Sequence, residues 1–474
     1  MYKLYVFLFV MLVGILCFTI WGIWQFGNVE IESLIFHLHM PLKSAPTDWL
    51  KWIWVPIFFM FSVGIWLVIL KKQIMSYPKT AWCVLILFFM FDMCYANNCF
   101  KILDYIKWNI QASDFIEKHY VYPRTTEIIF PLSKKNLILI QVESLETSIQ
   151  DKKNGGFFDV NAIPYLTHLA QSHISFSHAE FGQGATVLPG TSWTIAGLVA
   201  ETAGIPLKMY KTHKRIGNTM DRYSGFLSGV VSLGDILQKN GYQNIFILGT
   251  GKEFAGKENY VKQHGDYLIY DREDIPKKGN DASDYEVFEF AKSEIEKLGQ
   301  TNQPFHVLIQ TVDTHFGILK EGDCPTPFQK NFQNAFYCAD LNLKKFISWL
   351  QQSDIYDETV VVILGDHLTM GATVLNEMKS CDANASEITR KVYNAFIHSS
   401  AVPIQKNYRQ FSTMDMFPTI LASMGVQIKG ERLGLGTNLF SSEKTLSEKY
   451  GYNYLFQELG KKSDFYNHEL LYTK

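Results

Sequence analysis

The stretch Asn136-Leu-Ile-Leu-Ile-Gln-Val-Glu-Ser144 decides the fold class of this chain. Its first seven residues form a short and almost wholly apolar run, which is typical of a strand buried on both faces of a sheet. Glu143 and Ser144 follow this run directly. The stretch therefore predicts a buried strand that carries an acidic side chain at its carboxyl end.

Further apolar runs alternate with helical patterns after this strand. We predict strands at 244–248, 306–311 and 359–364, and helices at 162–171, 194–202, 233–239, 285–298, 339–350 and 414–424. Strands that alternate with helices indicate a mainly parallel sheet with helices on both faces. We therefore expect an α/β domain over residues 135–474, in which ligands bind beyond the carboxyl ends of the strands.

The first hundred residues form a separate, apolar region. The runs 4–26, 52–70 and 81–100 carry no charged residue except Asp92 in the third, and a helix needs about 20 apolar residues to cross a bilayer. We expect an anchor of three transmembrane helices over residues 1–100, followed by an amphipathic linker at the membrane surface over 101–134. A cleaved signal peptide is the alternative for the first run, but that run is long and lacks a small-residue cleavage site.

Lysines predict the orientation of this anchor. Lys71, Lys72 and Lys79 crowd the short second loop, which the positive-inside rule places in the cytoplasm. Three spans then put everything after residue 100 outside the cytoplasm. In that part, Cys324 and Cys338 flank a short, loop-like stretch and are candidates for a disulfide in an oxidising compartment.

Polar side chains follow two of the predicted strands at the same edge of the sheet. Glu143 comes after the first strand, and Asp366 and His367 come after the strand at 359–364. Each group alone is ordinary loop polarity, but carboxylates combined with an imidazole suit zinc or manganese. Their coincidence at one edge of a parallel sheet predicts a metal site.

A possible nucleophile lies between these groups, in Leu188-Pro-Gly-Thr-Ser-Trp-Thr-Ile-Ala-Gly197. Here a Pro-Gly pair breaks the chain, and we expect Thr191 at the N-terminus of the helix that follows, where free backbone N–H groups attract phosphate. Metal coordination can activate a threonine hydroxyl for attack. The alternative is that Thr191, Ser192 or Thr194 only caps the helix, and the segment alone leaves both interpretations open.

Two more groups are expected at the same edge. Val312-Asp-Thr-His315 follows the strand at 306–311, and His315 is a candidate for binding a phosphate oxygen or protonating a leaving alkoxide. Lys252 and Lys257 follow the strand at 244–248 and are candidates for neutralising phosphate charge. Taken singly, each is more often a solvated loop residue, so their weight comes from the whole set.

In this order, the motifs resemble the alkaline phosphatase/sulfatase superfamily. The likeness spans roughly residues 136–439 and rests on Val142-Glu-Ser-Leu-Glu146, Gly190-Thr-Ser-Trp-Thr-Ile-Ala-Gly197, Gly204-Ile-Pro-Leu207, Leu233-Gly-Asp-Ile-Leu237, Phe254-Ala-Gly-Lys257, Thr311-Val-Asp-Thr-His315, Gly365-Asp-His-Leu368 and Leu433-Gly-Leu-Gly436. Within the superfamily, the chain resembles the membrane-bound phosphoglycerol transferases that decorate osmoregulated periplasmic glucans. Lipoteichoic acid synthases and phosphoethanolamine transferases are more distantly similar, since Ala255 and Lys257 replace an aromatic residue and an arginine of the synthases.

The resemblance implies a sulfatase-like domain in the bacterial inner membrane, anchored by several passes and facing the periplasm or the cell exterior. It implies one divalent metal ion, manganese or zinc with magnesium as a further option. The implied metal ligands are Glu143, Thr191, Asp366 and His367. Thr191 is also the implied nucleophile, and Lys257, His315 and Asp313 are the implied substrate-binding residues.

The resemblance also implies the activity. We expect transfer of a phosphoglycerol head group from a phospholipid, phosphatidylglycerol being the simplest, to a periplasmic or surface glycan through a phospho-threonine intermediate. Phosphoethanolamine transfer and hydrolysis of a phosphodiester or sulfate ester are the alternatives, although no Cys/Ser-x-Pro-x-Arg motif of formylglycine sulfatases surrounds Thr191. A non-catalytic scaffold would have lost metal ligands, and all four are present. The net charge of -2 gives no basic face for nucleic acid.

Overall fold

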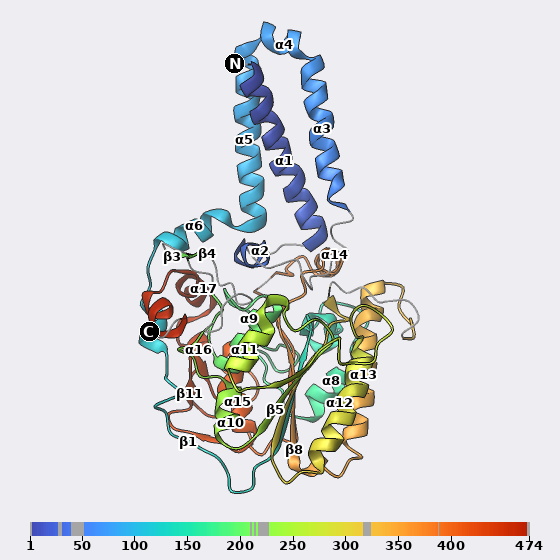
Figure 1. The fold of residues 1–474 in the computed structure, drawn as a ribbon, viewed down its shortest axis with the longest axis vertical. Helices are drawn as coiled ribbons and strands as arrows, with labels where there is room; N and C mark the ends of the chain where they lie inside the picture. The colour runs from blue at the N-terminus through green and yellow to red at the C-terminus, as the bar shows by residue number, and fades with distance from the viewer. Residues whose placement is uncertain are drawn as a thin grey trace.

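The computed structural model describes residues 2–26, 31–38, 52–208, 211–212, 215–216, 227–315, 324–386 and 388–471. An N-terminal stalk of helices stands on a larger α/β domain (Figure 1). The helices of the stalk and its base are α1 (Tyr2–Phe26), α2 (Ile31–Leu38), α3 (Trp54–Ile69), α4 (Lys71–Ser76), α5 (Pro78–Phe100) and α6 (Ile102–Ile110). Helix α1 packs against both α3 and α5.

Two helices of the stalk are long and apolar enough to cross a membrane. These are Tyr2–Trp24, with a mean hydropathy of 2.7, and Pro78–Phe100, with a mean hydropathy of 1.6. Helix α3 is apolar but has 16 residues, fewer than the roughly 20 that a span needs. The described residues therefore contain two candidate spans, and the third span at 52–70 stays a prediction.

The domain is built on a six-stranded sheet with the strand order β6-β5-β7-β2-β8-β9. The strands are β2 (Asn136–Val142), β5 (Gln243–Leu248), β6 (Leu268–Tyr270), β7 (Phe305–Gln310), β8 (Thr359–Gly365) and β9 (Asn394–Ile397). The first five run parallel, and only β9 pairs antiparallel, on the outer side of β8. The prediction of a mainly parallel sheet is confirmed.

Helices cover both faces of this sheet because its central strands are apolar on both sides. In β2, Leu137 and Leu139 enter one hydrophobic core, and Ile138 and Ile140 enter the other. The first core includes α9 (Thr194–Ala203), α10 (Leu233–Lys239), α11 (Lys257–Gln263) and α15 (Met416–Ser423). The second includes α8 (Pro164–Ser172), α12 (Asp284–Gly299), α13 (Asn331–Leu350) and α14 (Ala372–Cys381).

The remaining α-helices and strands of the described residues are short. They are α7 (Phe115–His119), α16 (Leu446–Tyr450), α17 (Tyr452–Gly460) and three two-stranded ribbons that pair β1 (Ile128–Ile129) with β10 (Gln427–Ile428), β3 (Lys211–Thr212) with β4 (Arg215–Ile216), and β11 (Arg432–Leu433) with β12 (Gly436–Thr437). Helix α17 packs on α6 and α7, so the C-terminal part of the chain holds the segment that follows the stalk. Cys324 and Cys338 form the disulfide for which they were candidates, and this bond ties residue 324 to α13.

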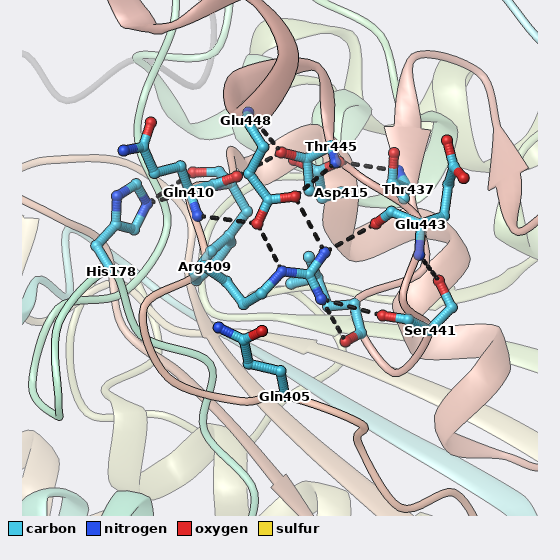
Figure 2. Close-up of polar contacts among 12 residues, drawn as sticks. His178, Gln405, Arg409, Gln410, Asp415, Thr437, Ser441, Glu443, Thr445 and Glu448 are labelled. Carbon is cyan, nitrogen blue, oxygen red and sulfur yellow. Dashed lines mark hydrogen bonds and ion pairs between the residues drawn. The ribbon is translucent and has the colours of Figure 1, made fainter.

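Arg409 holds the segment 439–448 in place through hydrogen bonds (Figure 2). The guanidinium group is buried, and it donates to both carboxylate oxygens of Glu448, with 2.6 Å between Nε and Oε1. It also donates to the carbonyl oxygens of Leu439, Ser441 and Glu443. These five hydrogen bonds use all five N–H donors of an arginine. Arg409 therefore has a structural role, and none of its N–H groups remains for a ligand.

Candidate functional site

The carboxyl ends of β2 and β8 bring Glu143, Asp366 and His367 together. One ligand atom from each residue lies within 4.8 Å of those from the other two. His367 Nε2 lies 3.1 Å from Glu143 Oε1 and 3.6 Å from Asp366 Oδ2. The three side chains meet because β2 and β8 are parallel neighbours and end level with each other, Val142 pairing with Gly365.

The backbone around Ser144 holds these side chains in place. Ser144 has a φ of +54°, a strained conformation for a residue other than glycine. In this conformation its N–H donates to Asp366 Oδ1 at 2.8 Å, and its hydroxyl donates to Glu143 Oε1 at 2.8 Å. The N–H of His367 also donates to Asp366 Oδ1, at 2.8 Å. Asp366 Oδ1 is thus held by two backbone groups.

The remaining atoms of this cluster fit a divalent cation. His367 Nδ1 lies 2.9 Å from the carbonyl oxygen of Leu368, so Nδ1 carries a proton and Nε2 faces the carboxylates as a potential ligand. Asp366 Oδ2 is fully buried and accepts no hydrogen bond from any described residue. A buried carboxylate oxygen without a donor is costly unless a cation contacts it. The donor set of two carboxylates and one imidazole suits zinc or manganese.

The pKa values within the cluster also favour a positive charge between the carboxylates. Burial raises the pKa of Asp366, and the Glu143 charge adds to this, giving about 7. Burial lowers the pKa of His367, but Asp366 and Glu143 outweigh it and raise this pKa to about 10. Two carboxylates in so small a buried volume require a positive charge between them, which either a protonated imidazole or a metal ion supplies.

The hydroxyl group at this cluster belongs to Thr194. Its Oγ1 donates to Glu143 Oε2 at 3.1 Å and lies 3.3 Å from His367 Nε2. Thr194 is the first residue of α9, and Trp193 is the N-cap residue, with extended backbone angles and a side chain that does not cap the helix. The first N–H groups of a helix have no intrahelical partner and attract anions. Thr194 therefore combines a hydroxyl beside the carboxylates with a helix start whose N–H groups can attract an anion.

Thr191, the expected nucleophile, occupies a different position. It is fully buried, and its Oγ1 donates to the carbonyl oxygen of Leu188 and accepts from the N–H of Leu188, both at 2.9 Å. These bonds close the turn that precedes α9. The structure does not bring the Thr191 hydroxyl to the metal cluster, and the geometry gives its expected roles as ligand and nucleophile no support.

Helix α9 lies directly against the end of β8. A Cβ atom added at Gly197 would stand 2.4 Å from the carbonyl oxygen of Asp366, which is far too close for any side chain. Gly197 follows Thr194 by three positions, so both lie on the same face of the helix. The missing side chain at Gly197 thus allows α9 to bring its first hydroxyl to the cluster.

Lys257 reaches the site from the N-terminus of α11. Its ammonium group is buried and donates to Thr250 Oγ1 at 2.8 Å and to Gln310 Oε1 at 3.0 Å. Burial lowers the pKa of Lys257 to about 8, although Glu143 acts in the opposite direction. Lys252, the other lysine considered, is partly exposed and anchors its loop through its backbone N–H on Asp271.

His315 and Asp313 follow β7, next to β2. Burial lowers the pKa of His315, and the Glu143 charge acts against this, so the imidazole senses the carboxylate of the cluster. Asp313 Oδ2 accepts from the N–H of Asp284 at 2.7 Å, and Asp284 Oδ1 accepts from the N–H of Asp313 at 3.1 Å. This reciprocal pair ties the His315 loop to the start of α12, which supports positioning rather than substrate contact for Asp313.

The family comparison covers most of this domain. Residues 135–426 match the family model named sulfatase. The chain is 32% identical over 352 residues to phosphoglycerol transferase I of Salmonella choleraesuis (strain SC-B67), and 32% identical over 343 residues to the protein of the same name from Shigella flexneri. These alignments cover 70% and 69% of this chain but only 42% and 41% of the relatives, so the chain spans less than half of their length.

Two solved structures share the fold at 20% sequence identity and a TM-score of 0.51. One is the lipoteichoic acid synthase from Listeria monocytogenes, with 70% of this chain and 82% of that chain covered. The other is a protein of the alkaline phosphatase superfamily from Vibrio parahaemolyticus, with 67% and 72% covered. At this level of identity the match concerns the arrangement of helices and strands.

Proposed function

Because this chain belongs to the sulfatase family, we propose that it is a metal-dependent transferase that forms a covalent intermediate on Thr194. The group transferred is phosphoglycerol, taken from a membrane phospholipid and passed to a glycan outside the cytoplasm. The single observation that carries this proposal is the Thr194 hydroxyl, 3.1 Å from Glu143 at the start of a helix. The identity to two phosphoglycerol transferases supports the choice of head group.

Glu143, Asp366 and His367, together with Thr194 Oγ1, would hold one divalent metal ion, manganese or zinc. Such an ion, when bound, favours the alkoxide form of a hydroxyl and neutralises charge on phosphoryl oxygens. Thr194 takes the roles that the sequence had suggested for Thr191. Its position at a helix N-terminus adds backbone N–H groups that stabilise negative charge on the phosphorus oxygens.

In the first half-reaction, Thr194 Oγ1 attacks the phosphorus atom of the phospholipid, and its proton leaves along the hydrogen bond to Glu143. The bond between phosphorus and the diacylglycerol oxygen breaks, and that oxygen takes a proton from the protonated form of His315, which is the minor form because burial lowers its pKa. Lys257 offsets the charge on the phosphate. Diacylglycerol leaves, and phosphoglycerol remains on Thr194.

In the second half-reaction, a glycan hydroxyl attacks the same phosphorus atom. The neutral His315 left by the first step accepts the proton of that hydroxyl. The bond between phosphorus and Thr194 Oγ1 breaks, and the threonine hydroxyl regains its proton from Glu143. The use of one imidazole as acid and then as base restores the starting state of the site.

The orientation of the domain supports a lipid donor. Helix α14 follows the Asp366–His367 loop, contacts α1 and lies at the end of the domain nearest the stalk (Figure 1). The metal cluster is thus on the side of the domain that faces the candidate spans. The disulfide between Cys324 and Cys338 supports an oxidising compartment for this domain, so we propose a multi-pass protein of the bacterial cytoplasmic membrane with its domain outside.

Trapping of the intermediate tests this function. The full chain in detergent is incubated with Mn²⁺ and phosphatidylglycerol labelled in its head group, or with phosphatidylethanolamine labelled in its head group, and the peptide containing Thr194 is analysed by mass spectrometry. We expect a phosphoglycerol adduct on Thr194. Labelled phosphoethanolamine on Thr194 would establish the alternative donor.

Two variants locate the adduct. Thr194→Val keeps the shape of the side chain and removes its hydroxyl, and it should abolish labelling. Thr191→Val is the matched control, because it makes the same chemical change three residues earlier, and it should keep the label in the folded protein. An adduct that survives in Thr194→Val and disappears in Thr191→Val would overturn the assignment of the nucleophile.

A further inference from the structure

Lys257 begins a row of buried polar side chains near the metal cluster, which continues through Gln310 and Gln141 to Glu201. Gln141 of β2 and Gln310 of β7 pair in register across neighbouring strands. They continue the face on which Leu139 and Leu308 enter the first hydrophobic core, and both amides are buried. Amides in such a place are costly unless they are hydrogen-bonded. Their presence at the end of two otherwise apolar strands therefore needs a reason.

The hydrogen bonds of this row all point in one direction. Lys257 Nζ donates to Gln310 Oε1 at 3.0 Å, Gln310 Nε2 donates to Gln141 Oε1 at 2.8 Å, and Gln141 Nε2 donates to Glu201 Oε2 at 2.7 Å. An ammonium group only donates, so Lys257 fixes the orientation of both amides. Hydrogen bonds that run head to tail polarise one another and strengthen the row.

The far end of the row lies on the helix that carries Thr194. Glu201 belongs to α9 and is buried. It follows Thr194 by seven positions and Gly197 by four, which places all three on one face of the helix. The same face therefore presents the hydroxyl, packs on Asp366 and receives the row that begins at Lys257.

We propose that Gln310, Gln141 and Glu201 are positioning residues that fix the Lys257 ammonium group relative to the Thr194 hydroxyl. The ligand held between these two groups is a phosphate ester. Its negative charge faces the Lys257 ammonium group, and its phosphorus atom lies at Thr194 Oγ1. This inference rests on the proposed function, which gives Lys257 the phosphate and Thr194 the attack.

The geometry at Lys257 leaves room for this role. Within the described residues, its ammonium group donates to Thr250 and Gln310, which leaves one of its three N–H groups for a ligand. A lysine on a flexible four-carbon stem would otherwise lose rotamer freedom when it binds phosphate. The row removes that freedom beforehand, so binding and attack occur with the charge already in place.

A double-mutant cycle tests the proposal. The full chain in detergent with saturating Mn²⁺ is titrated with inorganic phosphate by calorimetry, for the wild type, Gln310→Met, Lys257→Met and the double variant. We expect Gln310→Met to weaken phosphate binding about fivefold or more when Lys257 is present, and by less than about twofold when Lys257 is replaced, since residues of one network are not additive. Equal losses in both backgrounds, or unchanged binding in Lys257→Met, would overturn the proposal.

Conservative and control variants separate positioning from folding. Glu201→Gln retains an oxygen that accepts from Gln141 and should keep phosphate affinity, whereas Glu201→Leu should lose it as Gln310→Met does. Asn244 is a buried amide of β5 that donates to the carbonyl oxygens of Gly234 and Gly265. Asn244→Leu should lower the melting temperature without changing phosphate affinity. Weakened binding in Asn244→Leu as well would mean that the row acts only through stability.

Phosphate binding needs neither the donor nor the acceptor of the proposed reaction. A protein that binds phosphate through Lys257 but forms no adduct on Thr194 would refute the proposed function and leave the positioning row standing. A protein that forms the adduct but shows an additive cycle would do the reverse.

Discussion

Two buried charged clusters of this domain differ in how far their polar atoms are satisfied. Arg409 donates five hydrogen bonds to Glu448 and three carbonyl oxygens, so none of its donors is left over (Figure 2). Asp366 lies in an equally buried place, yet its Oδ2 accepts no hydrogen bond from the described residues. Buried polar groups in proteins are nearly always paired. The satisfied cluster fits a structural role, and the open one, where a second carboxylate and an imidazole face the unpaired oxygen, is the proposed metal site.

The largest effect is expected from removing the negative charge of Asp366 in the open cluster. In Asp366→Asn, the carboxylate that faces Glu143 and His367 becomes a neutral amide and loses its affinity for a cation. We expect transfer to fall by at least about a thousandfold, as for loss of a group central to the chemistry. The measurement is the rate of head-group transfer, with metal content determined on the same sample.

Asp415→Asn is the matched control for this change. Asp415 is also a buried carboxylate, but its oxygens accept from the N–H groups of Ser412 and Thr437 at 2.7 and 2.8 Å. We expect this variant to lose stability and to keep its transfer rate when folded. A transfer rate that falls as far in Asp415→Asn as in Asp366→Asn would contradict the distinction between the two clusters.

Removal of the buried arginine tests the satisfied cluster. Arg409→Met leaves Glu448 without its partner, and breaking a buried ion pair typically costs about 3–5 kcal/mol. We expect the free energy of unfolding to fall by that amount, measured by urea denaturation in detergent, while the folded fraction keeps its activity. No change in stability would show that Arg409 does not stabilise this part of the fold.

A smaller effect is expected where α9 meets β8. Gly197→Ala places a methyl group against the Asp366 carbonyl oxygen and should push Thr194 away from the cluster. Because misplacement by about 1 Å can cost a hundredfold in rate, we expect a loss of about that size. Gly279→Ala is the control, since its nearest described contact is at 3.4 Å, and it should be neutral.

The smallest effect concerns pH. Burial lowers the pKa of His178, which is drawn with Arg409 in Figure 2, to about 4 from the ordinary 6.5. The unfolded chain therefore binds more protons than the folded chain between these values, so stability should fall as pH drops from about 6.5 towards 4. The melting temperature across this window measures it. His178→Gln should have a flatter profile, and an equal slope in both proteins would exclude His178 as a cause.

The sheet was largely predictable because its strands are short apolar runs with polar ends. Strand β2 matches its prediction, β5 and β8 differ from theirs by one residue at one end, and β7 is shifted by one residue at both ends. Strand β6 has three residues and β9 has four, which is too short for a periodic pattern to be recognised. The metal cluster was predictable for the same reason as the sheet, since its residues come directly after two of these strands.

The sequence led to Thr191 as the expected nucleophile, whereas the geometry favours Thr194, because two signals within one segment conflicted. The Pro-Gly pair before Thr191 suggested that the helix starts there, whereas the apolar pattern predicted a helix from residue 194, which is where α9 begins. The second signal pointed to Thr194. The pairing of Gln141 with Gln310 could not be predicted from the sequence, because it depends on the register of β2 and β7.

The central claim is that one cation is shared by Glu143, Asp366, His367 and the hydroxyl of Thr194. Crystals of the full chain grown with Zn²⁺, with anomalous data collected at the zinc edge, test it most directly. We predict one anomalous peak within about 2.3 Å of an atom from each of these four residues. A peak that contacts Thr191 instead of Thr194, or no peak at the cluster, would contradict it.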